Sequence, residues 1–440
     1  MTDTGSLSSV STEFWERTVR SSQSVKGKME PVDYVLLGLA ILIFSCWSVN
    51  WALHIMAIAY GKWKLRHKLK TSVPEELPGV SIIKPLVGVD PNLFENLETF
   101  FNLKYPQYEI LFCIQDESDA AIMVVQSLIQ KYPKIQTKVF IGGRTVGVNP
   151  KINNMILGYE AAQYELILIS DSGIKMCEDT LEDMAVCLNN KVGMVHQMPY
   201  ISDRSGFASH VEKVFFGTQH AKMYLCANML GINCTTGMSC LMKKDVIQEA
   251  GGLTAFAEYL AEDYLLAQAF IDRGWQVKIS SETAKQNSGH YSISHFHARL
   301  IRWTKLRIAT IPLVSALEPI FQCMFLGAVA SWAVSYLFDW TALVFFLVHV
   351  LVWFLLDYIL AKVVQGGPLP YSKFEFLVGW ILNETCFLYF IFCAHLNPVV
   401  EWRGHKYKLR WGGMMEELNS QNNYKSNLKH TLIEISSDKA

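Results

Sequence analysis

The sequence predicts an α/β domain with a mostly parallel sheet, placed between an apolar N-terminal helix and an apolar C-terminal helical region. Short apolar runs with strand character alternate with segments of helical period from residue 79 to about 200. Stretches apolar enough to cross a bilayer flank this region on both sides. The 440 residues are 51% hydrophobic and 18% charged, with a mean hydropathy of +0.19 and a net charge of −1. This balance excludes a disordered chain and a nucleic-acid-binding protein.

Four apolar stretches are predicted to lie in the membrane: 34–60, 319–338, 340–361 and 374–396. The first two contain no acid, lysine or arginine, and about 20 apolar residues suffice to span a bilayer core. The last contains Glu384 near its middle. An ionisable group at that depth is costly unless it faces protein or water, so 374–396 is either transmembrane or re-entrant.

Basic residues predict the orientation of the chain, because they favour the cytosolic end of a span. Lys62, Lys64 and Arg66 follow the first stretch directly. The order expected from this is a flexible lumenal leader at 1–30, the anchor, a cytosolic domain at 71–303, an interfacial link at 304–318, the remaining spans and a tail at 401–440. After three further spans the basic start of that tail would be lumenal, against the same rule, and a re-entrant 374–396 removes the conflict.

The ten cysteines agree with a cytosolic domain, since they are scattered and form no CxxC pair. We therefore expect free thiols. The sequon at Asn233 is expected to carry no glycan, because glycosylation needs a lumenal loop.

The elements of the cytosolic domain follow from its apolar pattern. The predicted strands are 80–83, 108–114, 138–141, 166–169 and 194–195, with helical period at 120–130 and 152–162 between them. In parallel sheets covered by helices, ligands bind at the carboxyl ends of the strands. Polar residues just after each strand are therefore the candidates for a functional site.

Acids follow two of these strands. Asp116 and Asp119 come after 108–114, where a carboxylate could accept hydrogen bonds from a nucleobase or ribose. Asp171, in Asp-Ser-Gly, comes directly after 166–169, where it could hold a divalent cation that bridges a diphosphate. Asp119 could equally be a helix N-cap, because it precedes an apolar helical segment.

Further polar candidates lie later in the chain. Glu262 and Asp263 open a predicted helix, where acids also suit the helix dipole. Arg299, Arg302 and Trp303 form a basic stripe that could instead contact anionic lipid. His290, His295 and His297 suggest zinc at first sight, but no further ligand stands at the required spacing, so ordinary polar roles are favoured.

The order of these motifs carries a resemblance. A strand-end acid, Asp-Ser-Gly, Glu-Asp and Arg-x-x-Arg-Trp resemble the D, D, D, (Q/R)xxRW signature of inverting, family-2-like glycosyltransferases with the GT-A fold. The resemblance is closest to the ceramide glucosyltransferase family, and covers the chain from the first span to about Gly413. It rests on the segments 84–93, 149–154, 236–242, 286–289 and 301–307.

The resemblance implies roles for individual residues. Asp119 and Asp116 would lie on the uridine side, Asp171 would be the metal-associated acid, and Asp263 would be the general base. Gly173 stands where many relatives have a second acid, so a water or another acid would complete the shell of Mg²⁺ or Mn²⁺. Arg299 and Arg302 would face the diphosphate, and Trp303 and His220 would lie at the acceptor side. Lys151 would contact the nucleotide or be a solvated helix lysine. Glu262 would orient Asp263 or cap its helix.

The same resemblance implies glucose transfer from UDP-glucose to the primary hydroxyl of ceramide, with inversion. The implied partners are UDP-glucose, ceramide and the lipid bilayer, with a homo-oligomer left open, and the implied location is the Golgi membrane, with the endoplasmic reticulum as an alternative. Within enzymes, the rival is another GT-A transferase acting on dolichyl phosphate or a polysaccharide. Outside enzymes, the rival is a membrane transporter or scaffold whose acids are structural.

Overall fold

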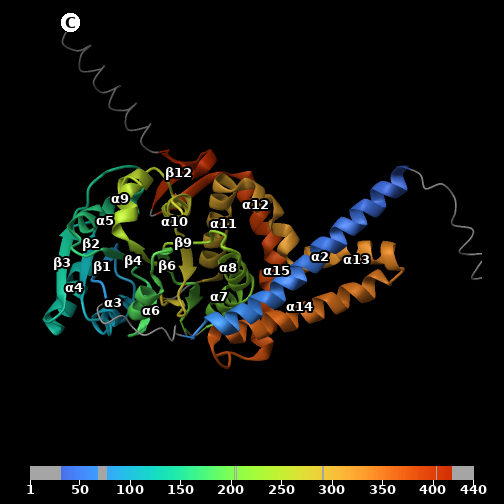
Figure 1. Ribbon diagram of the computed structural model, residues 1–440, viewed down its shortest axis with the longest axis horizontal. Helices are drawn as coiled ribbons and strands as arrows, with labels where there is room; N and C mark the ends of the chain where they lie inside the picture. Colours follow the sequence, from blue (N-terminus) through green and yellow to red (C-terminus); the bar gives the residue numbers. More distant parts are fainter. Residues whose placement is uncertain are drawn as a thin grey trace, which may run out of the picture.

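The structure is a computed structural model that describes residues 31–67, 77–202, 204, 206–289, 292–402 and 404–418. The predicted leader 1–30, the end of the tail and His290 lie outside the described residues. Figure 1 shows an α/β domain with a bundle of long helices extending from one side.

The domain is built on a seven-stranded sheet with the order β3-β2-β1-β4-β8-β6-β9. The strands are β1 (Val80–Leu86), β2 (Tyr108–Ile114), β3 (Gln136–Ile141), β4 (Leu166–Ser170), β6 (Val192–His196), β8 (Ser239–Lys243) and β9 (Gln276–Ile279). All neighbours pair in parallel except β8, which is antiparallel to β4 and β6. The predicted fold class is confirmed, and the five strands expected from the sequence all lie in this sheet.

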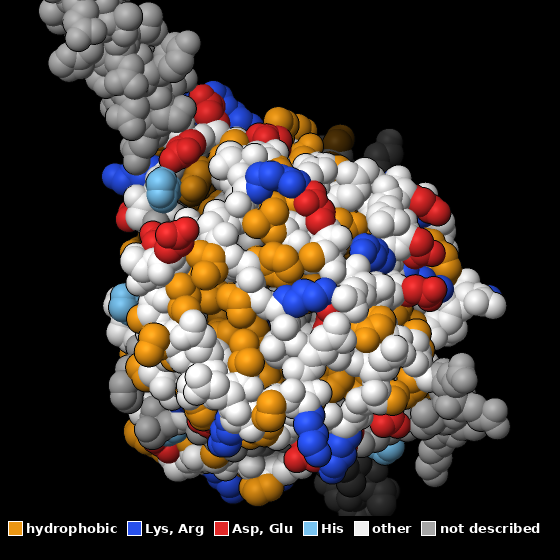
Figure 2. Space-filling view, turned by 90° about the vertical axis from the view of Figure 1, so that its left-hand side faces the viewer, with side chains coloured by type: hydrophobic (Ala, Val, Ile, Leu, Met, Phe, Trp, Pro, Cys, Tyr) orange, Lys and Arg blue, Asp and Glu red, His pale blue; other side chains and the backbone are white. Residues whose placement is uncertain are grey.

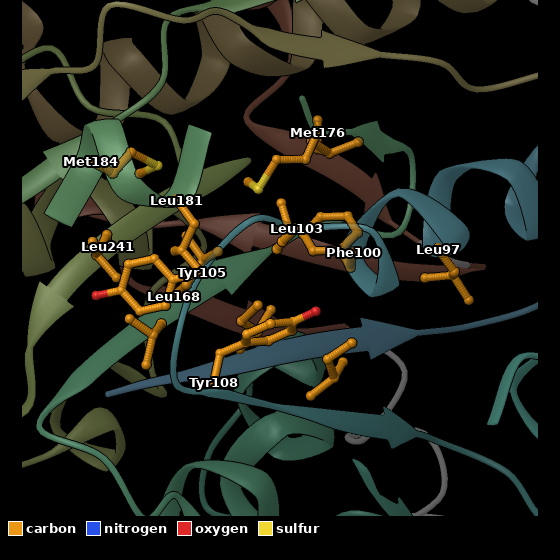
Figure 3. Close-up of a cluster of buried hydrophobic side chains, with 14 of the residues drawn as sticks. Leu97, Phe100, Leu103, Tyr105, Tyr108, Leu168, Met176, Leu181, Met184 and Leu241 are labelled. Carbon is orange, nitrogen blue, oxygen red and sulfur yellow. The ribbon is translucent and has the colours of Figure 1, made fainter. Parts of the chain in front are cut away.

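Helices cover both faces of the sheet, because its central strands are apolar on both sides. One face is covered by α3 (Leu93–Phe101), α4 (Ala121–Lys131) and α6 (Thr180–Cys187), and the other by α5 (Pro150–Ala161), α9 (Lys244–Glu249) and α10 (Glu262–Asp272). Figure 3 shows the first of these cores, in which Phe100 and Leu168 are fully buried. Burial of side chains of this size stabilises the fold by ~1.5–3 kcal/mol each.

Further elements lie outside the seven-stranded sheet. They are β5 (Ile174–Lys175), β7 (Pro199–Ile201), α7 (Phe207–Gly217), α8 (Gln219–Leu230), η1 (Leu253–Phe256), β10 (Ala284–Gln286) and α11 (Ile293–Thr310). The end of the domain opposite the helical bundle, shown in Figure 2, carries charged side chains of both signs without a large patch of one sign.

Within the described part of the chain, three helices are long and apolar enough to cross a membrane: α2 (Pro31–Lys64), α14 (Ala342–Gln365) and α15 (Lys373–Leu396). A fourth candidate is a pair bent by 71°, formed by Pro312–Phe321 and α13 (Cys323–Phe338). The pair comprises α12 (Pro312–Leu317), the 3₁₀ turn η2 (Glu318–Phe321) and α13. These helices make the chain a membrane protein.

The helices α2, α13 and α14 run alternately up and down. The hydroxyl of Tyr336, at the end of α13, lies 3.4 Å from the carbonyl of Asp33, at the start of α2. At the other end of α2, Arg66 donates to the carbonyl of Val363 near the end of α14 (2.9 Å). The chain therefore returns through α14 to the side of the α/β domain.

The helix α15 differs from these three in its neighbours, since it packs mainly against α7 and α11 of the α/β domain. Glu384 is buried there and accepts hydrogen bonds from Gln219 (2.7 Å) and from the backbone of Cys323 (3.1 Å). Stretch 374–396 is thus one unbroken helix lying along the domain, whereas the predicted span 319–338 is interrupted before Cys323. The predicted link 304–318 is likewise divided, because α11 continues to Thr310.

The described part of the predicted tail is folded. It forms an antiparallel sheet of β11 (Val399–Trp402), β12 (His405–Leu409) and β13 (Met415–Glu417), with the short turn η3 (Trp411–Gly413). The backbone of Met415 donates to the carbonyl of Glu258 (2.9 Å), and Leu260 packs into the apolar face of this sheet. The C-terminal sheet therefore lies on the side of the α/β domain and supports the segment that leads into α10.

Gly366→Ala is expected to lower stability by about 2 kcal/mol, because a non-glycine residue in a left-handed conformation costs ~1–2 kcal/mol and Arg66 must also move. Gly366 has a φ of +76°, and a Cβ there would lie 2.2 Å from the Arg66 guanidinium carbon. Thermal unfolding of the detergent-purified chain measures the loss. Gly367→Ala is the matched control, since a Cβ at Gly367 meets no atom within 4 Å; equal losses for both variants would contradict this account.

Candidate active site

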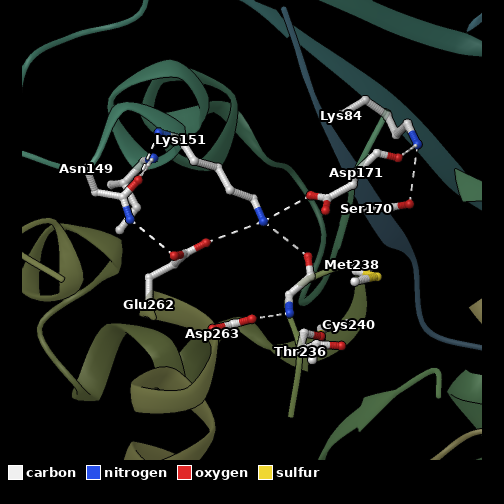
Figure 4. A network of polar contacts seen from close by, with 12 residues as sticks. Lys84, Asn149, Lys151, Ser170, Asp171, Thr236, Met238, Cys240, Glu262 and Asp263 are labelled. Atoms are coloured by element: carbon white, nitrogen blue, oxygen red, sulfur yellow. Dashed lines mark hydrogen bonds and ion pairs between the residues drawn. The ribbon is translucent and has the colours of Figure 1, made fainter. Parts of the chain in front are cut away.

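The centre of the site is the ammonium group of Lys151. It lies 3.0 Å from Asp171 Oδ1 and 3.3 Å from Glu262 Oε1, and it donates to the carbonyl of Gly237 (3.1 Å). Figure 4 shows these contacts, with Asp263 beside them and bonded through Oδ2 to the backbone N–H of Gly237. Residues from β4, α5, α10 and the loop before β8 therefore meet at the carboxyl end of β4.

The local sequence explains why Lys151 points into this space. Asn149 caps α5 by accepting from the backbone of Lys151 (2.8 Å) and Ile152 (3.2 Å), and Pro150 stands in the first turn. The amide of the same Asn149 donates to Glu262 Oε2 (3.1 Å). One cap residue thus fixes both the start of α5 and the carboxylate that opens α10.

Burial and charge shift the titration of this cluster. Burial raises the pKa of Glu262 to about 7, although Lys151 opposes the shift. Burial also raises the pKa of Asp263, again against the pull of Lys151. Burial alone would lower the pKa of Lys151, but the summed attraction of Asp171, Glu262 and Asp263 raises it. Lys151 therefore stays charged. The pKa values of Glu262 and Asp263, in contrast, lie closer to neutral pH than those of ordinary acids.

Asp171 lies between two lysines. Its carboxylate contacts Lys151, and its backbone carbonyl accepts from Lys84 (2.8 Å), whose side chain is fully buried against the ring of Phe100 (3.7 Å). Burial lowers the pKa of Lys84 to about 7, against the attraction of Asp171. The Asp171 side chain remains 41% exposed, so its carboxylate is accessible to a ligand.

Asp116 and Asp119 lie at the same sheet edge but do not contact the Lys151 cluster. Asp119 Oδ1 accepts from the backbone of Ala121 (2.8 Å), and its Oδ2 accepts from the backbone of Gly88 after β1 (2.7 Å). Ala120 and not Asp119 is the N-cap of α4, but Asp119 binds the backbone N–H of the first residue of this helix and ties the loop after β1 to the loop after β2. Hydrogen bonds from Ser118 lower the pKa of Asp116, which leaves an exposed, ionised carboxylate.

The helix α11 brings Arg299 to the other wall of the site. Arg299 lies 3.3 Å from buried Glu212 and 4.0 Å from the sulfur of Met238, the neighbour of Gly237. Its guanidinium also stacks on Trp303, with 4.5 Å to the ring centroid. Arg299 and Arg302 border a groove of about 750 Å³, whose other lining residues include Asp90, Gly289, His295, Lys305 and Glu401.

The histidines take apolar or peripheral positions. His220 is buried between Phe216, Tyr224 and Trp303, and burial lowers its pKa to about 3, so it is neutral. His295 borders the groove, whereas His297 packs on Phe390. Among the described residues no group of three or more His, Cys, Asp or Glu side chains could hold a metal on its own.

Sequence reasoning missed some of the residues that hold the site. Lys84, Asn149 and Glu212 were not assigned roles, although each fixes a predicted site residue. A lysine inside an otherwise apolar strand was the available signal for Lys84. Glu212 carried no local signal, since its partner Arg299 is far along the chain.

Comparison with known proteins identifies the family of the chain. The family described as Glycosyl transferase family 21 matches residues 49–415. The chain belongs to this family. It is a glycosyltransferase, as predicted, and the transporter and scaffold alternatives are set aside.

Curated relatives fall in the same group. Ceramide glucosyltransferase 3 of Caenorhabditis elegans is 43% identical over 86% of this chain and 82% of its own length. Ceramide glucosyltransferase 1 of the same organism is 42% identical over 86% and 81%. Ceramide glucosyltransferase of Komagataella phaffii is 26% identical over 84% and 91%. Among solved structures, a mannosyltransferase from Pyrobaculum calidifontis in complex with GDP-Man and Mn²⁺ aligns with a TM-score of 0.46 at 15% identity, covering 82% of this chain and 98% of that one.

Proposed function

We propose that the protein transfers glucose from UDP-glucose to the primary hydroxyl of ceramide, with inversion, giving glucosylceramide and UDP. The observation that carries this proposal is the meeting of Asp171, Glu262 and Asp263 around Lys151, beside Arg299, in a domain packed against membrane helices. The identity to ceramide glucosyltransferases supports the choice of donor and acceptor.

Asp263 is the proposed general base. Its carboxylate is fixed by backbone N–H groups of Gly237 and Tyr264, and its raised pKa makes it a better proton acceptor than a free aspartate. It would take the hydroxyl proton as the ceramide oxygen attacks the anomeric carbon and UDP leaves from the opposite side. Arg299 and Arg302 would face the charge that develops on the leaving diphosphate.

A divalent cation fits this site only when it is shared with the donor. The partly exposed carboxylate of Asp171 can supply one ligand of such an ion, but Gly173 supplies no second carboxylate. A side chain at position 173 would also have its Cβ 2.8 Å from Ser288 Oγ. Mg²⁺ and Mn²⁺ commonly complete their shells with substrate phosphates and water. Asp171 would hold the cation, and the cation would neutralise the diphosphate.

The membrane helices support an interfacial location for the transfer. Ceramide remains in the bilayer whereas UDP-glucose is soluble, so the acceptor must meet the donor at the membrane surface. The helix α11, which carries Arg299 and Arg302, packs on α15, whose opposite face exposes Leu388, Phe392 and Leu396. This arrangement would place the groove at the depth of the lipid headgroups.

We further propose that the α/β domain faces the cytosol from the Golgi membrane. Lys62, Lys64 and Arg66 lie at the end of α2 nearest the domain, as the charge rule requires for a cytosolic side. Because α14 returns the chain and α15 lies along the domain, the C-terminal sheet would be cytosolic as well. The basic residues at the start of the tail would then lie on the cytosolic side, as the charge rule requires.

The test is incubation of the full chain in proteoliposomes with labelled UDP-glucose and ceramide, with UDP-galactose and dolichyl phosphate as competitors. We expect label in a glucosylceramide of inverted configuration, with little competition from either molecule. Transfer of label to dolichyl phosphate in preference to ceramide would contradict the proposal.

Transfer activity is expected to fall along an acid limb whose midpoint lies above the value near 4 of an ordinary aspartate. Proton acceptance needs ionised Asp263, whose pKa burial raises, and Glu262 titrates beside it at about 7. Activity is therefore high above both pKa values and is lost as pH falls through them. Because two groups titrate together, the loss should extend over a wider pH range than the titration of a single group. The profile of kcat/KM against pH measures this, with UDP binding as the control; a single midpoint at or below 4 would refute it.

A further inference from the structure

The ammonium group of Lys151 is surrounded by three oxygens in this structure. It donates a hydrogen bond to the carbonyl of Gly237 (3.1 Å) and forms ion pairs with Asp171 (3.0 Å) and Glu262 (3.3 Å). A contact between Lys151 and a bound nucleotide, as the resemblance implied, therefore requires that one of these partners is given up.

The partner that Lys151 can release at least cost is Asp171. The Asp171 side chain is 41% exposed, whereas those of Glu262 and Lys151 are 11% and 12% exposed. Glu262 is also held from its other oxygen by Asn149, so it is fixed on both sides. Water can replace a lost contact at Asp171 but not in the interior of the cluster.

The charges of the cluster also leave room for a second cation. Lys151 is the ammonium that Asp171, Glu262 and Asp263 share, so the four groups carry excess negative charge whenever the carboxyl groups are ionised. Asp171 is the member of this cluster that is open to solvent and at the end of β4, where a donor diphosphate would arrive.

We propose that Lys151 is a built-in counterion that occupies Asp171 in the donor-free enzyme and yields it to the divalent cation that enters with the donor diphosphate. The inference rests on the proposed use of a nucleotide-sugar donor, but not on the identity of the sugar or of the lipid. Lys151 is thus a positioning residue for Asp171. Once released from Asp171, the Lys151 ammonium can donate to an anionic oxygen of the nucleotide-sugar.

Mn²⁺ binding to the detergent-purified full chain, followed by electron paramagnetic resonance without nucleotide, tests this directly. Lys151→Met keeps the length of the side chain but removes the competing charge. We expect it to bind Mn²⁺ at least about tenfold more tightly than the wild type, since one unit charge a few ångströms away is worth more than that factor at a partly buried site. Unchanged or weaker Mn²⁺ binding by the variant would overturn the proposal.

Two further variants exclude a merely structural effect. Lys151→Arg keeps the charge and should bind Mn²⁺ like the wild type. Lys151→Met/Asp171→Asn should lose the gain, because it lacks the carboxylate for which the cations compete. A gain that survives in the double variant would contradict the assignment to Asp171.

A measurement on the wild type keeps the proposal testable if Lys151→Met does not fold. Addition of UDP should tighten Mn²⁺ binding at least about tenfold, because phosphate oxygens must join Asp171 to displace Lys151. Equal Mn²⁺ affinity with and without UDP would overturn the inference. The proposed function can fail separately, since the transfer assay with ceramide measures it and Mn²⁺ affinity without acceptor does not.

Discussion

Asp263→Asn is expected to reduce transfer of glucose to ceramide at least about a hundredfold, because a positioned general base contributes roughly 10²–10⁴ in rate and an amide cannot accept the proton. The variant should remain folded. Asp263 accepts hydrogen bonds from the backbone of Gly237 and Tyr264, and Asn is isosteric and loses only one of these, at a cost of about 1 kcal/mol. Single-turnover transfer measures the rate, and calorimetric titration with UDP measures donor-product binding.

The matched control is Asp272→Asn, the same change at the other end of α10. Asp272 accepts from Gln268 on the surface and does not contact the Lys151 cluster, so transfer should remain at the wild-type level. If Asp263→Asn retains activity, the base must be another group. Buried Glu262, with its pKa near 7, would then be the first to examine.

The position of the site in the fold could be predicted from the sequence because it depends on short-range patterns. Asp116 and Asp171 closely follow the parallel strands β2 and β4, which places both acids at one edge of the sheet. Glu262 and Asp263 likewise open a helix that the sequence predicts. The structure brings Asp171, Glu262 and Asp263 together, as this reasoning required.

The partners of these acids could not be predicted, because they depend on contacts between distant parts of the chain. In the sequence, Lys151 cannot be told from an ordinary helix lysine. Its contacts with Asp171 and Glu262 arise only because α5, β4 and α10 lie side by side. Lys84 is likewise explained only by the pairing of β1 with β4, which brings its ammonium to the carbonyl of Asp171. The functional roles of all the candidate site residues remain predictions.

The contacts of the membrane helices could not be predicted from the sequence either. Length and composition identify the apolar stretches but not their neighbours. Asn383 and Glu384 look costly in a lipid-exposed helix, yet Asn383 donates to the carbonyl of Val211 (3.1 Å) and Glu384 is bonded to Gln219. Conversely, the charge-free stretch 319–338 is broken at Gln322, whose extended backbone separates the turn η2 from α13.

One carboxylate joins three of the apolar helices. Asp357 on α14 lies 3.1 Å from His54 Nε2 on α2, and both side chains are fully buried. Its other oxygen accepts from the indole N–H of Trp380 on α15 (2.8 Å). The Lys222 ammonium of α8 is also buried nearby, 4.1 Å above the ring of Trp353, against which His54 packs. Asp357 thus holds α15 to the bundle.

Asp357→Leu is expected to lower the stability of the detergent-purified chain by about 3 kcal/mol, because removal of one partner leaves the other polar groups buried without compensation. The double variant His54→Leu/Asp357→Leu should recover part of this loss, since the unpaired imidazole is removed with the carboxylate. Thermal unfolding measures both. Asp339→Asn is the control, because it removes an exposed carboxylate at a left-handed position that Asn tolerates well. If Asp357→Leu unfolds at the wild-type temperature, Asp357 does not join these helices, and α15 must be held to the bundle by its apolar contacts and by Glu384 alone.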